Sequence, residues 1–153
     1  MSDASALVLV RATTLLEIFP LRHAELRPGL PHDTARFDGD DDSASRHFGA
    51  FLVDDGAIVG CASFMRRSWN GEPGWQLRGM ATRADHVRRG IGARLLGFAE
   101  ETLCAEPGPS LLWCNARLTA VPFYERVGWV VVSDVFEVPT VGPHRAMVRR
   151  MAR

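Results

Sequence analysis

The sequence WQLRGMATRADHVRRGIGARLLGFAEET, residues 75–102, decides the fold of this chain. Its pattern predicts a strand, a loop, a tight turn and a helix, in that order. The turn has the sequence VRRGIG at residues 87–92. Backbone N–H groups converge at such a turn, and the N-terminus of the helix behind it carries a partial positive charge. This arrangement binds phosphate groups.

The residue types of the turn favour the same kind of ligand. Gly90 and Gly92 lack a Cβ atom, so a ligand can approach the backbone closely. Arg88 and Arg89 add guanidinium groups, which can bind a phosphate through two parallel hydrogen bonds. We therefore expect a nucleotide-like ligand with several phosphates. A plain surface turn that begins a helix is the alternative, because Gly-x-Gly before a helix is common.

Two familiar phosphate-binding motifs fit the turn poorly. A P-loop ends in Gly-Lys-Ser/Thr, and this chain has no lysine because all 18 of its basic residues are arginines. The dinucleotide fingerprint needs a third glycine three positions after the second, where this chain has Leu95. The sequence excludes the first motif and argues against the second.

A third motif fits better. The segment VRRGIGARLL resembles the pyrophosphate loop Gln/Arg-x-x-Gly-x-Gly/Ala of the GNAT superfamily of acyl-CoA N-acyltransferases, from which it departs at Val87. The resemblance implies that acetyl-CoA is bound by the turn and by the main chain of the preceding strand. The turn residues are Arg88, Arg89, Gly90, Ile91, Gly92 and Ala93, and the strand residues are Met80, Ala81 and Thr82. Main-chain N–H groups of that strand can also stabilise an oxyanion.

The segment LLWCNARLTAVPFYERVGW, residues 111–129, carries a second resemblance. It is similar to the GNAT strand and helix that read Asn-x-x-Ala-x-x-Phe-Tyr-x-x-x-Gly-Phe/Trp, with a slightly longer spacing between Asn115 and Ala120. The resemblance implies that Tyr124 contacts the cofactor and, as a general acid, protonates the CoA thiolate. It also implies that Asn115 hydrogen-bonds the pantetheine arm or a bound water. The alternatives are a packed ring at Tyr124 beside Phe123 and a turn-capping role for Asn115.

A general base is harder to assign. Many GNAT enzymes have a glutamate on the strand that here contains Gln76 and Arg78, and no carboxylate stands there. His144, in the sequence Gly-Pro-His near the end of the chain, is the leading candidate because histidine accepts protons near neutral pH. The alternative for His144 is a structural hydrogen-bonding role, which is the commoner one for a lone loop histidine. The base could also act through water, or be unnecessary if the amine arrives neutral. Weaker candidates are His32, Asp33 and Glu25.

The remaining titratable clusters predict no metal site. The acidic run at residues 38–42 fails the EF-hand pattern at Ser43 and Gly49, and is interpreted as a solvated loop or as a region that attracts a cationic amine. The three cysteines are widely spaced and form no zinc-binding pattern. Cys114 lacks a visible base partner, so a buried strand position fits it better than a nucleophile.

The element order predicts a single mixed α/β domain over residues 1–153. Strands are expected at residues 6–12, 48–53, 58–64, 76–81, 111–115, 129–138 and 145–151. Helices are expected at residues 15–26, from residue 91 to the Pro-Gly-Pro at 107–109, and at residues 121–126, with a long loop at residues 28–46. The resemblance implies the GNAT fold, a mostly antiparallel sheet of six to seven strands flanked by helices.

The sequence therefore predicts an N-acetyltransferase that moves an acetyl group from acetyl-CoA to a primary amine by direct attack. A non-catalytic acyl-CoA-binding regulatory module and an unrelated nucleotide-binding domain are the alternatives. Zero net charge argues against a nucleic-acid partner, and no apolar run is long enough for a membrane helix. Without a signal-peptide pattern, the cytoplasm is the expected compartment. The acceptor, a small molecule or a peptide, should bind near residues 21–46 and the last hairpin, and a homodimer is conceivable by analogy.

Overall fold

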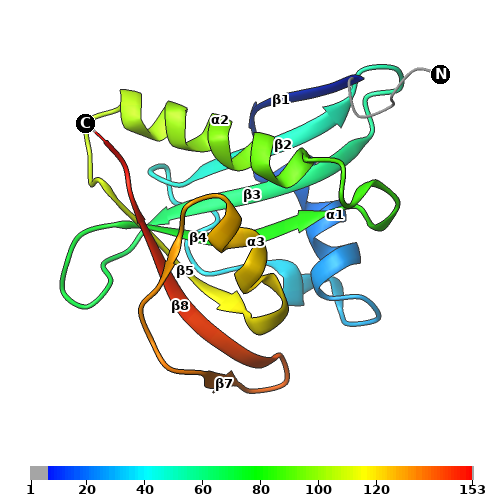
Figure 1. Ribbon diagram of the computed structural model, residues 1–153. Coiled ribbons are helices and arrows are strands. Elements are labelled where there is room, and N and C mark those ends of the chain that lie inside the picture. Colours follow the sequence, from blue (N-terminus) through cyan, green and yellow to red (C-terminus); the bar gives the residue numbers. More distant parts are fainter. Residues whose placement is uncertain (1–6, 153) are drawn as a thin grey trace.

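Residues 7–152 are described by a computed structural model of the chain (Figure 1). The strands are β1 (Val8–Thr13), β2 (Arg46–Leu52), β3 (Ile58–Arg66), β4 (Trp75–Thr82), β5 (Leu111–Arg117), β6 (Val130–Val131), β7 (Phe136–Val138) and β8 (Gly142–Arg150). The α-helices are α1 (Leu15–Leu26), α2 (Ile91–Ala105) and α3 (Val121–Arg126). Short 3-10 helices are η2 (His32–Ala35), η3 (Ala84–His86) and η4 (Leu118–Ala120).

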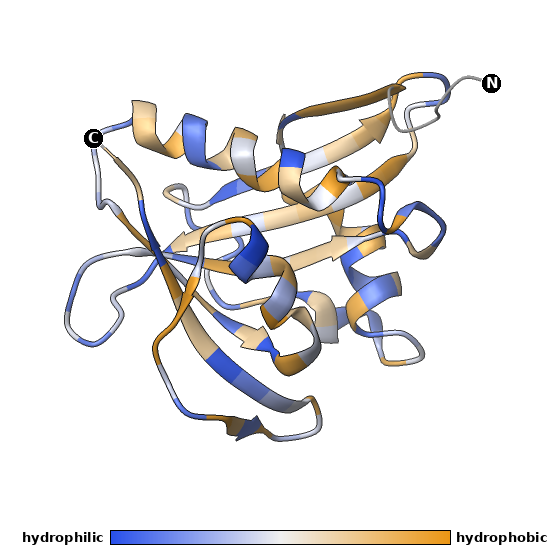
Figure 2. Ribbon diagram, in the orientation of Figure 1, coloured by the Kyte–Doolittle hydropathy of each residue, from blue (hydrophilic) through white to orange (hydrophobic). Residues whose placement is uncertain are grey.

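The strands form one sheet with the order β1-β2-β3-β4-β5-β8-β6, and β7 pairs with β8. All pairs are antiparallel except β4 with β5. Helices α2 and α3 pack on one face over the largest core cluster, and α1 packs on the other (Figure 1). Hydrophobic residues follow the central strands, whereas α2 alternates between hydrophobic and polar positions (Figure 2). This alternation is typical of a helix with one buried face.

The two parallel strands separate soon after they begin. Only the pairs Trp75–Leu112 and Gln76–Trp113 join β4 to β5. Beyond these pairs the strands spread apart, as Figure 1 shows. The main chain of β4 after Gln76 therefore has an edge that β5 does not cover, and such an edge can pair with an extended ligand.

A β-bulge lies in β4 beside this opening. The register against β3 shifts between Cys61 and Ser63, where β4 holds one extra residue. Gly79 lies in the bulge with a φ of +65°, a conformation that favours glycine. A Cβ atom there would lie 2.7 Å from Nε of Arg22, so the close packing of α1 also requires glycine.

The ends of the helices follow from their sequences. Thr14 caps α1 by accepting a hydrogen bond from the backbone N–H of Glu17 at 3.3 Å. Gly90, with a φ of +76°, precedes α2 and provides no side chain to cap it. Gly128, with a φ of +96°, follows α3. No helix within residues 7–152 is long and apolar enough to cross a membrane.

The predicted fold class is confirmed, and the C-terminal strands need a correction. The segment 129–138 was expected to be one strand, but it divides into β6 and β7, which gives eight strands within the described chain. The side chain of Ser133 explains the break, because its Oγ accepts the N–H of Ala146 at 2.8 Å in place of a backbone carbonyl. Strand β8 also begins at Gly142, three residues before the predicted start, so that His144 lies on a strand.

Candidate active site

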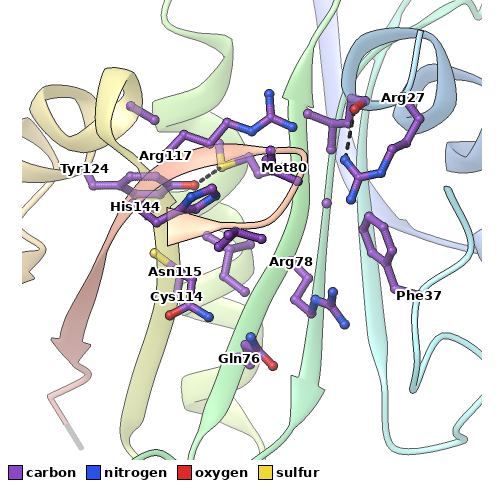
Figure 3. Close-up of a pocket in the computed structure, with 17 residues that line it drawn as sticks. Arg27, Phe37, Gln76, Arg78, Met80, Cys114, Asn115, Arg117, Tyr124 and His144 are labelled. Carbon is purple, nitrogen blue, oxygen red and sulfur yellow. Dashed lines mark hydrogen bonds between the residues drawn. The ribbon is translucent and has the colours of Figure 1, made fainter. Parts of the chain in front are cut away.

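A cavity of about 240 Å³ opens where β4 and β5 separate (Figure 3). Its walls come from the end of α1, the loop after it, β4, β5, α3 and the hairpin of β7 and β8. The lining side chains include four residues singled out from the sequence, and these are Met80, Asn115, Tyr124 and His144. The fold thus brings residues from four separate segments to one cavity.

Tyr124 is a buried phenol at the wall of this cavity. Its hydroxyl donates a hydrogen bond to the sulfur of Met80 at 3.7 Å, and its ring contacts the rings of Phe123 and Trp129. Burial raises the pKa of Tyr124 above its usual value of 10, and the nearby Cys114 adds to the effect. The hydroxyl is therefore protonated at neutral pH, as a proton donor must be.

Met80 connects the cavity to the start of α2. A Cβ atom added at Gly92 would lie 3.4 Å from Cε of Met80 and 3.0 Å from Cζ of Phe123. The absence of a side chain at Gly92 thus serves internal packing as well as ligand approach. Only ligand approach was expected from the sequence. Through these contacts, the glycine turn and Tyr124 are close neighbours.

The start of α2 fits a pyrophosphate. The first N–H of the helix with a helical acceptor is that of Arg94, which bonds the carbonyl of Gly90 at 3.1 Å. The N–H groups of residues 91–93 have no acceptor of this kind. The first turn of α2 has no acidic side chain, and the space around Gly90 is open. Arg88 and Arg89 are exposed, so their guanidinium groups are accessible to a phosphate.

His144 is buried in the wall of the cavity, with 5% of its surface exposed. Its ring stacks on Phe136, and its Nδ1 lies 2.8 Å from the carbonyl oxygen of Gly142. Because a carbonyl only accepts hydrogen bonds, Nδ1 carries the proton in this contact, and Nε2 is the acceptor nitrogen of the neutral ring.

Asn115 and Cys114 lie on opposite faces of β5. Cys114 and Ala116 belong to the core cluster that contains Tyr124, whereas Asn115 and Arg117 are exposed on the other face. Burial raises the pKa of the Cys114 thiol to about 12, so it is not a thiolate at neutral pH. Asn115 therefore lines the cavity from the face opposite Tyr124.

Arg117 is a cavity residue that the sequence reasoning missed. A signal was present, because the motif Asn-x-x-Ala places its asparagine three residues before the alanine. Counted back from Ala120, this position is Arg117 and not Asn115. Arg27, Phe37 and Arg78 also line the cavity, and no local motif distinguishes them.

The weaker base candidates lie elsewhere. Glu25 accepts a hydrogen bond from the backbone N–H of Ala84 at 3.2 Å. His32 and Asp33 line a second cavity of about 530 Å³ beside α1. Among the described residues, the walls of the first cavity contain no aspartate or glutamate, and no group of three or more potential metal ligands is present.

One residue of the acidic run differs from the expectation of a solvated loop. Asp40 is 4% exposed and pairs with the buried guanidinium of Arg22, where Nη1 and Oδ2 lie 2.7 Å apart. A buried cation requires such a partner. Asp41 and Asp42 are exposed, as expected.

A sheet that opens between two parallel strands, beside a helix N-terminus suited to a pyrophosphate, defines a class of acyl-CoA-binding enzymes. The acetyltransferase (GNAT) domain family matches residues 35–142. A relative from Bacillus subtilis (strain 168), the uncharacterized N-acetyltransferase YitI, is 30% identical over 145 residues, which cover 93% of this chain and 95% of the relative.

Solved structures agree on the fold. Escherichia coli ElaA matches with a TM-score of 0.77 at 17% identity, over 94% of this chain and 99% of its own. An aminoglycoside 6'-N-acetyltransferase complexed with coenzyme A matches with a TM-score of 0.74 at 14% identity, over 95% of this chain and 98% of its own. The chain belongs to the GNAT acetyltransferase family. It is an N-acetyltransferase that uses acetyl-CoA and an amine acceptor.

Proposed function

We propose that this enzyme transfers the acetyl group directly to a primary amine, with Tyr124 as the general acid. The observation that carries the proposal is the buried, protonated hydroxyl of Tyr124, which contacts Met80 at the cavity between β4 and β5. The amine nitrogen forms a bond to the thioester carbonyl carbon as the carbon–sulfur bond breaks. The thiolate then takes the proton of Tyr124, so no covalent enzyme intermediate is required.

The amine nitrogen loses one proton as the amide forms, and we propose that His144 accepts this proton. The Nδ1 contact with Gly142 supports this role, because it makes Nε2 the acceptor nitrogen. The uncovered edge of β4 supports a further role for Met80, Ala81 and Thr82, whose main chain would hold the pantetheine arm. A N–H group of the same edge would stabilise the developing oxyanion.

The pyrophosphate of acetyl-CoA would bind at the start of α2, on residues 88–93. The exposed residue Ala93 allows a sharp test of this assignment, because it is the third residue of the helix. A glutamate at that position stabilises a helix through the helix dipole. The variant Ala93→Glu should therefore stay folded while its charge repels the pyrophosphate. Ala93→Gln is the matched neutral control.

Isothermal titration calorimetry with acetyl-CoA is the experiment. We expect micromolar binding to the wild type and to Ala93→Gln, and binding at least tenfold weaker to Ala93→Glu. Equal binding of acetyl-CoA by both variants would mean that the pyrophosphate does not bind at the start of α2. An absence of binding to the wild type would contradict the proposed function as a whole.

The acceptor would be a small molecule or a peptide. A net charge of zero supports this proposal over a nucleic-acid acceptor, which needs an excess of basic residues. Release of CoA thiol, followed with a panel of amines, tests it. Tight binding of acetyl-CoA without turnover of any amine would instead favour a regulatory module.

A further inference from the structure

Three arginines line the cavity. Arg27 follows the C-terminus of α1, Arg78 lies on β4, and Arg117 ends β5. Figure 3 shows their side chains around the cavity, with Phe37 beside Arg27 and Arg78. Within the described chain, no acidic side chain lines this cavity, so its walls carry an excess of positive charge.

Within the described chain, no carboxylate pairs directly with these three arginines. Nη1 of Arg27 donates a hydrogen bond to the carbonyl of Leu26 at 2.9 Å. Among residues 7–152, no salt bridge joins Arg27, Arg78 or Arg117 to an acid. Partial burial lowers the pKa of Arg27 and, separately, of Arg78, and nearby arginines lower both further. The charge of Asp40 offsets part of the effect at Arg78. Both groups would therefore gain from an anionic ligand.

The ring of Phe37 makes cation–π contacts with Arg27 and Arg78, and also with Arg22. The guanidinium carbons of Arg22, Arg27 and Arg78 lie 4.4, 5.3 and 4.6 Å from its centroid. Both carboxylate oxygens of Asp40 bond Arg22. The charge of Asp40 also raises the pKa of Arg78, but no salt bridge joins the two residues. The guanidinium groups of Arg27 and Arg78 are positioned by cation–π contacts and lack an acidic partner. A planar guanidinium held in this way is suited to a carboxylate, which it can bind through two hydrogen bonds.

The three cavity arginines lie apart from the start of α2, where the phosphates of acetyl-CoA would bind. The start of α2 packs on the face of the sheet that holds Leu77, Cys114 and Tyr124. Successive side chains of a strand point to opposite faces of the sheet. Arg78 follows Leu77 and Arg117 follows Ala116, and both of these neighbours belong to that cluster. The two arginine side chains therefore lie on the other face, toward α1. The ligand with the negative charge is then expected on the acceptor side of the cavity.

We propose that the acceptor amine carries a carboxylate, as an amino acid or a small peptide does, and that Arg27, Arg78 and Arg117 bind it. This inference rests on the proposed function and narrows its substrate class. A carboxylate could also belong to the acyl group of a dicarboxylic acyl-CoA such as succinyl-CoA. The experiment therefore varies the acceptor and the donor separately.

The acceptor arm uses matched pairs of amines, which are glycine and glycinamide, β-alanine and β-alaninamide, and glycylglycine and its amide. Release of CoA thiol from acetyl-CoA gives kcat/KM for each. We expect the acid of at least one pair to exceed its amide by about tenfold to a hundredfold, the range for a hydrogen bond to a charged group. Arg78→Gln should reduce this ratio toward one, and Arg78→Lys should retain part of it.

Arg126→Gln is the matched control, because it removes one exposed positive charge from α3 outside the cavity. Circular dichroism of every variant checks the fold. Amides that react as well as their acids would overturn the inference. An acid-to-amide ratio that Arg78→Gln leaves unchanged would do the same.

The donor arm compares calorimetric binding of succinyl-CoA and acetyl-CoA. If Arg78→Gln weakens the binding of succinyl-CoA and affects no acceptor, the arginines bind the acyl group of the donor and the inference is wrong. If no amine of the panel reacts, the same acids are titrated into CoA-saturated protein. Binding that Arg78→Gln weakens would support the inference, and absent binding would overturn it. Acetyl-CoA binding in the same preparation tests the proposed function independently.

Discussion

Arg22 and Asp40 form an ion pair from which solvent is excluded, since both side chains are 0% exposed. Two hydrogen bonds of 2.7 and 3.0 Å join them. Arg22 also donates to the carbonyl of Ala35 and to Oγ of Ser63. The pair thereby fixes the loop after α1 against the sheet, and this loop contributes Phe37 to the cavity between β4 and β5.

The first prediction concerns the stability that this pair provides. Asp40→Asn keeps the shape of the side chain but leaves the guanidinium of Arg22 buried without a counter-charge. Loss of one partner from a buried pair costs about 3–5 kcal/mol. We expect the free energy of unfolding, measured by urea denaturation, to fall by about that amount.

Asp41→Asn is the control, because Asp41 is next in sequence and its ion pair with Arg36 is largely exposed. Exposed pairs contribute little to stability, so the midpoint of this variant should match that of the wild type. Equal effects of the two substitutions would show that the buried pair has no special role.

A second prediction concerns His47, which bonds the same network. Its Nδ1 lies 2.6 Å from Oγ of Ser63, and its Nε2 lies 3.1 Å from the carbonyl oxygen of Asp40. Burial lowers the pKa of His47 below its usual value of 6.5. As the pH falls below about 6.5, the unfolded chain therefore takes up a proton that the folded chain does not, and stability decreases.

The slope of unfolding free energy against pH, measured by urea denaturation from pH 7.5 to 5, tests this expectation. His47→Gln should make that slope shallower, whatever its effect at pH 7.5. His23→Gln serves as the control at a histidine outside the network. An identical slope for the wild type and His47→Gln would contradict the prediction.

The sequence predicted those parts of the fold that depend on local patterns. Helices α1 and α3 were expected at the residues where they occur, since a threonine cap, a proline and a glycine mark their ends. The division of the segment 129–138 was not expected, because it depends on a contact between Ser133 and Ala146, which are far apart in sequence.

The cavity shows the same contrast. Tyr124 was found from its motif, and the structure adds its location beside Met80. Arg27, Phe37 and Arg78 were not found, because they come from three segments and meet only after folding. The burial of Asp40 was missed for the same reason, since Arg22 lies on another element. Patterns in a sequence show local periodicity but not which charges will face one another.

A third prediction separates backbone strain from packing at Gly79. Both Gly79 and Gly56 have positive φ angles, of +65° and +74°. An added Cβ meets Arg22 at 2.7 Å in the first case and no atom within 4 Å in the second. Gly56→Ala should lose about 1–2 kcal/mol of stability from strain alone. Gly79→Ala should lose about 1–3 kcal/mol more from overpacking, and equal losses in urea denaturation would contradict this.

A fourth prediction uses the fact that the chain has a single tyrosine. Ultraviolet absorbance of tyrosinate therefore reports Tyr124 alone. Burial raises the pKa of this phenol above 10, so the folded protein should show no tyrosinate at pH 10. The urea-unfolded chain should be about half ionised at that pH, near the usual pKa of tyrosine. Equal ionisation of both states would mean that the hydroxyl is exposed.

The last prediction concerns catalysis by Tyr124. Tyr124→Phe removes only the hydroxyl, and its hydrogen bond to Met80 is the one such contact of that group within residues 7–152. The ring contacts with Phe123 and Trp129 should persist, so the fold and the affinity for acetyl-CoA should change little. If the hydroxyl protonates the departing thiolate, kcat should fall by about 10²–10⁴ with the best amine of the panel. Stopped-flow measurement of thiol release gives kcat, and calorimetry gives the affinity. A kcat within twofold of the wild type, at unchanged affinity, would remove Tyr124 from the mechanism.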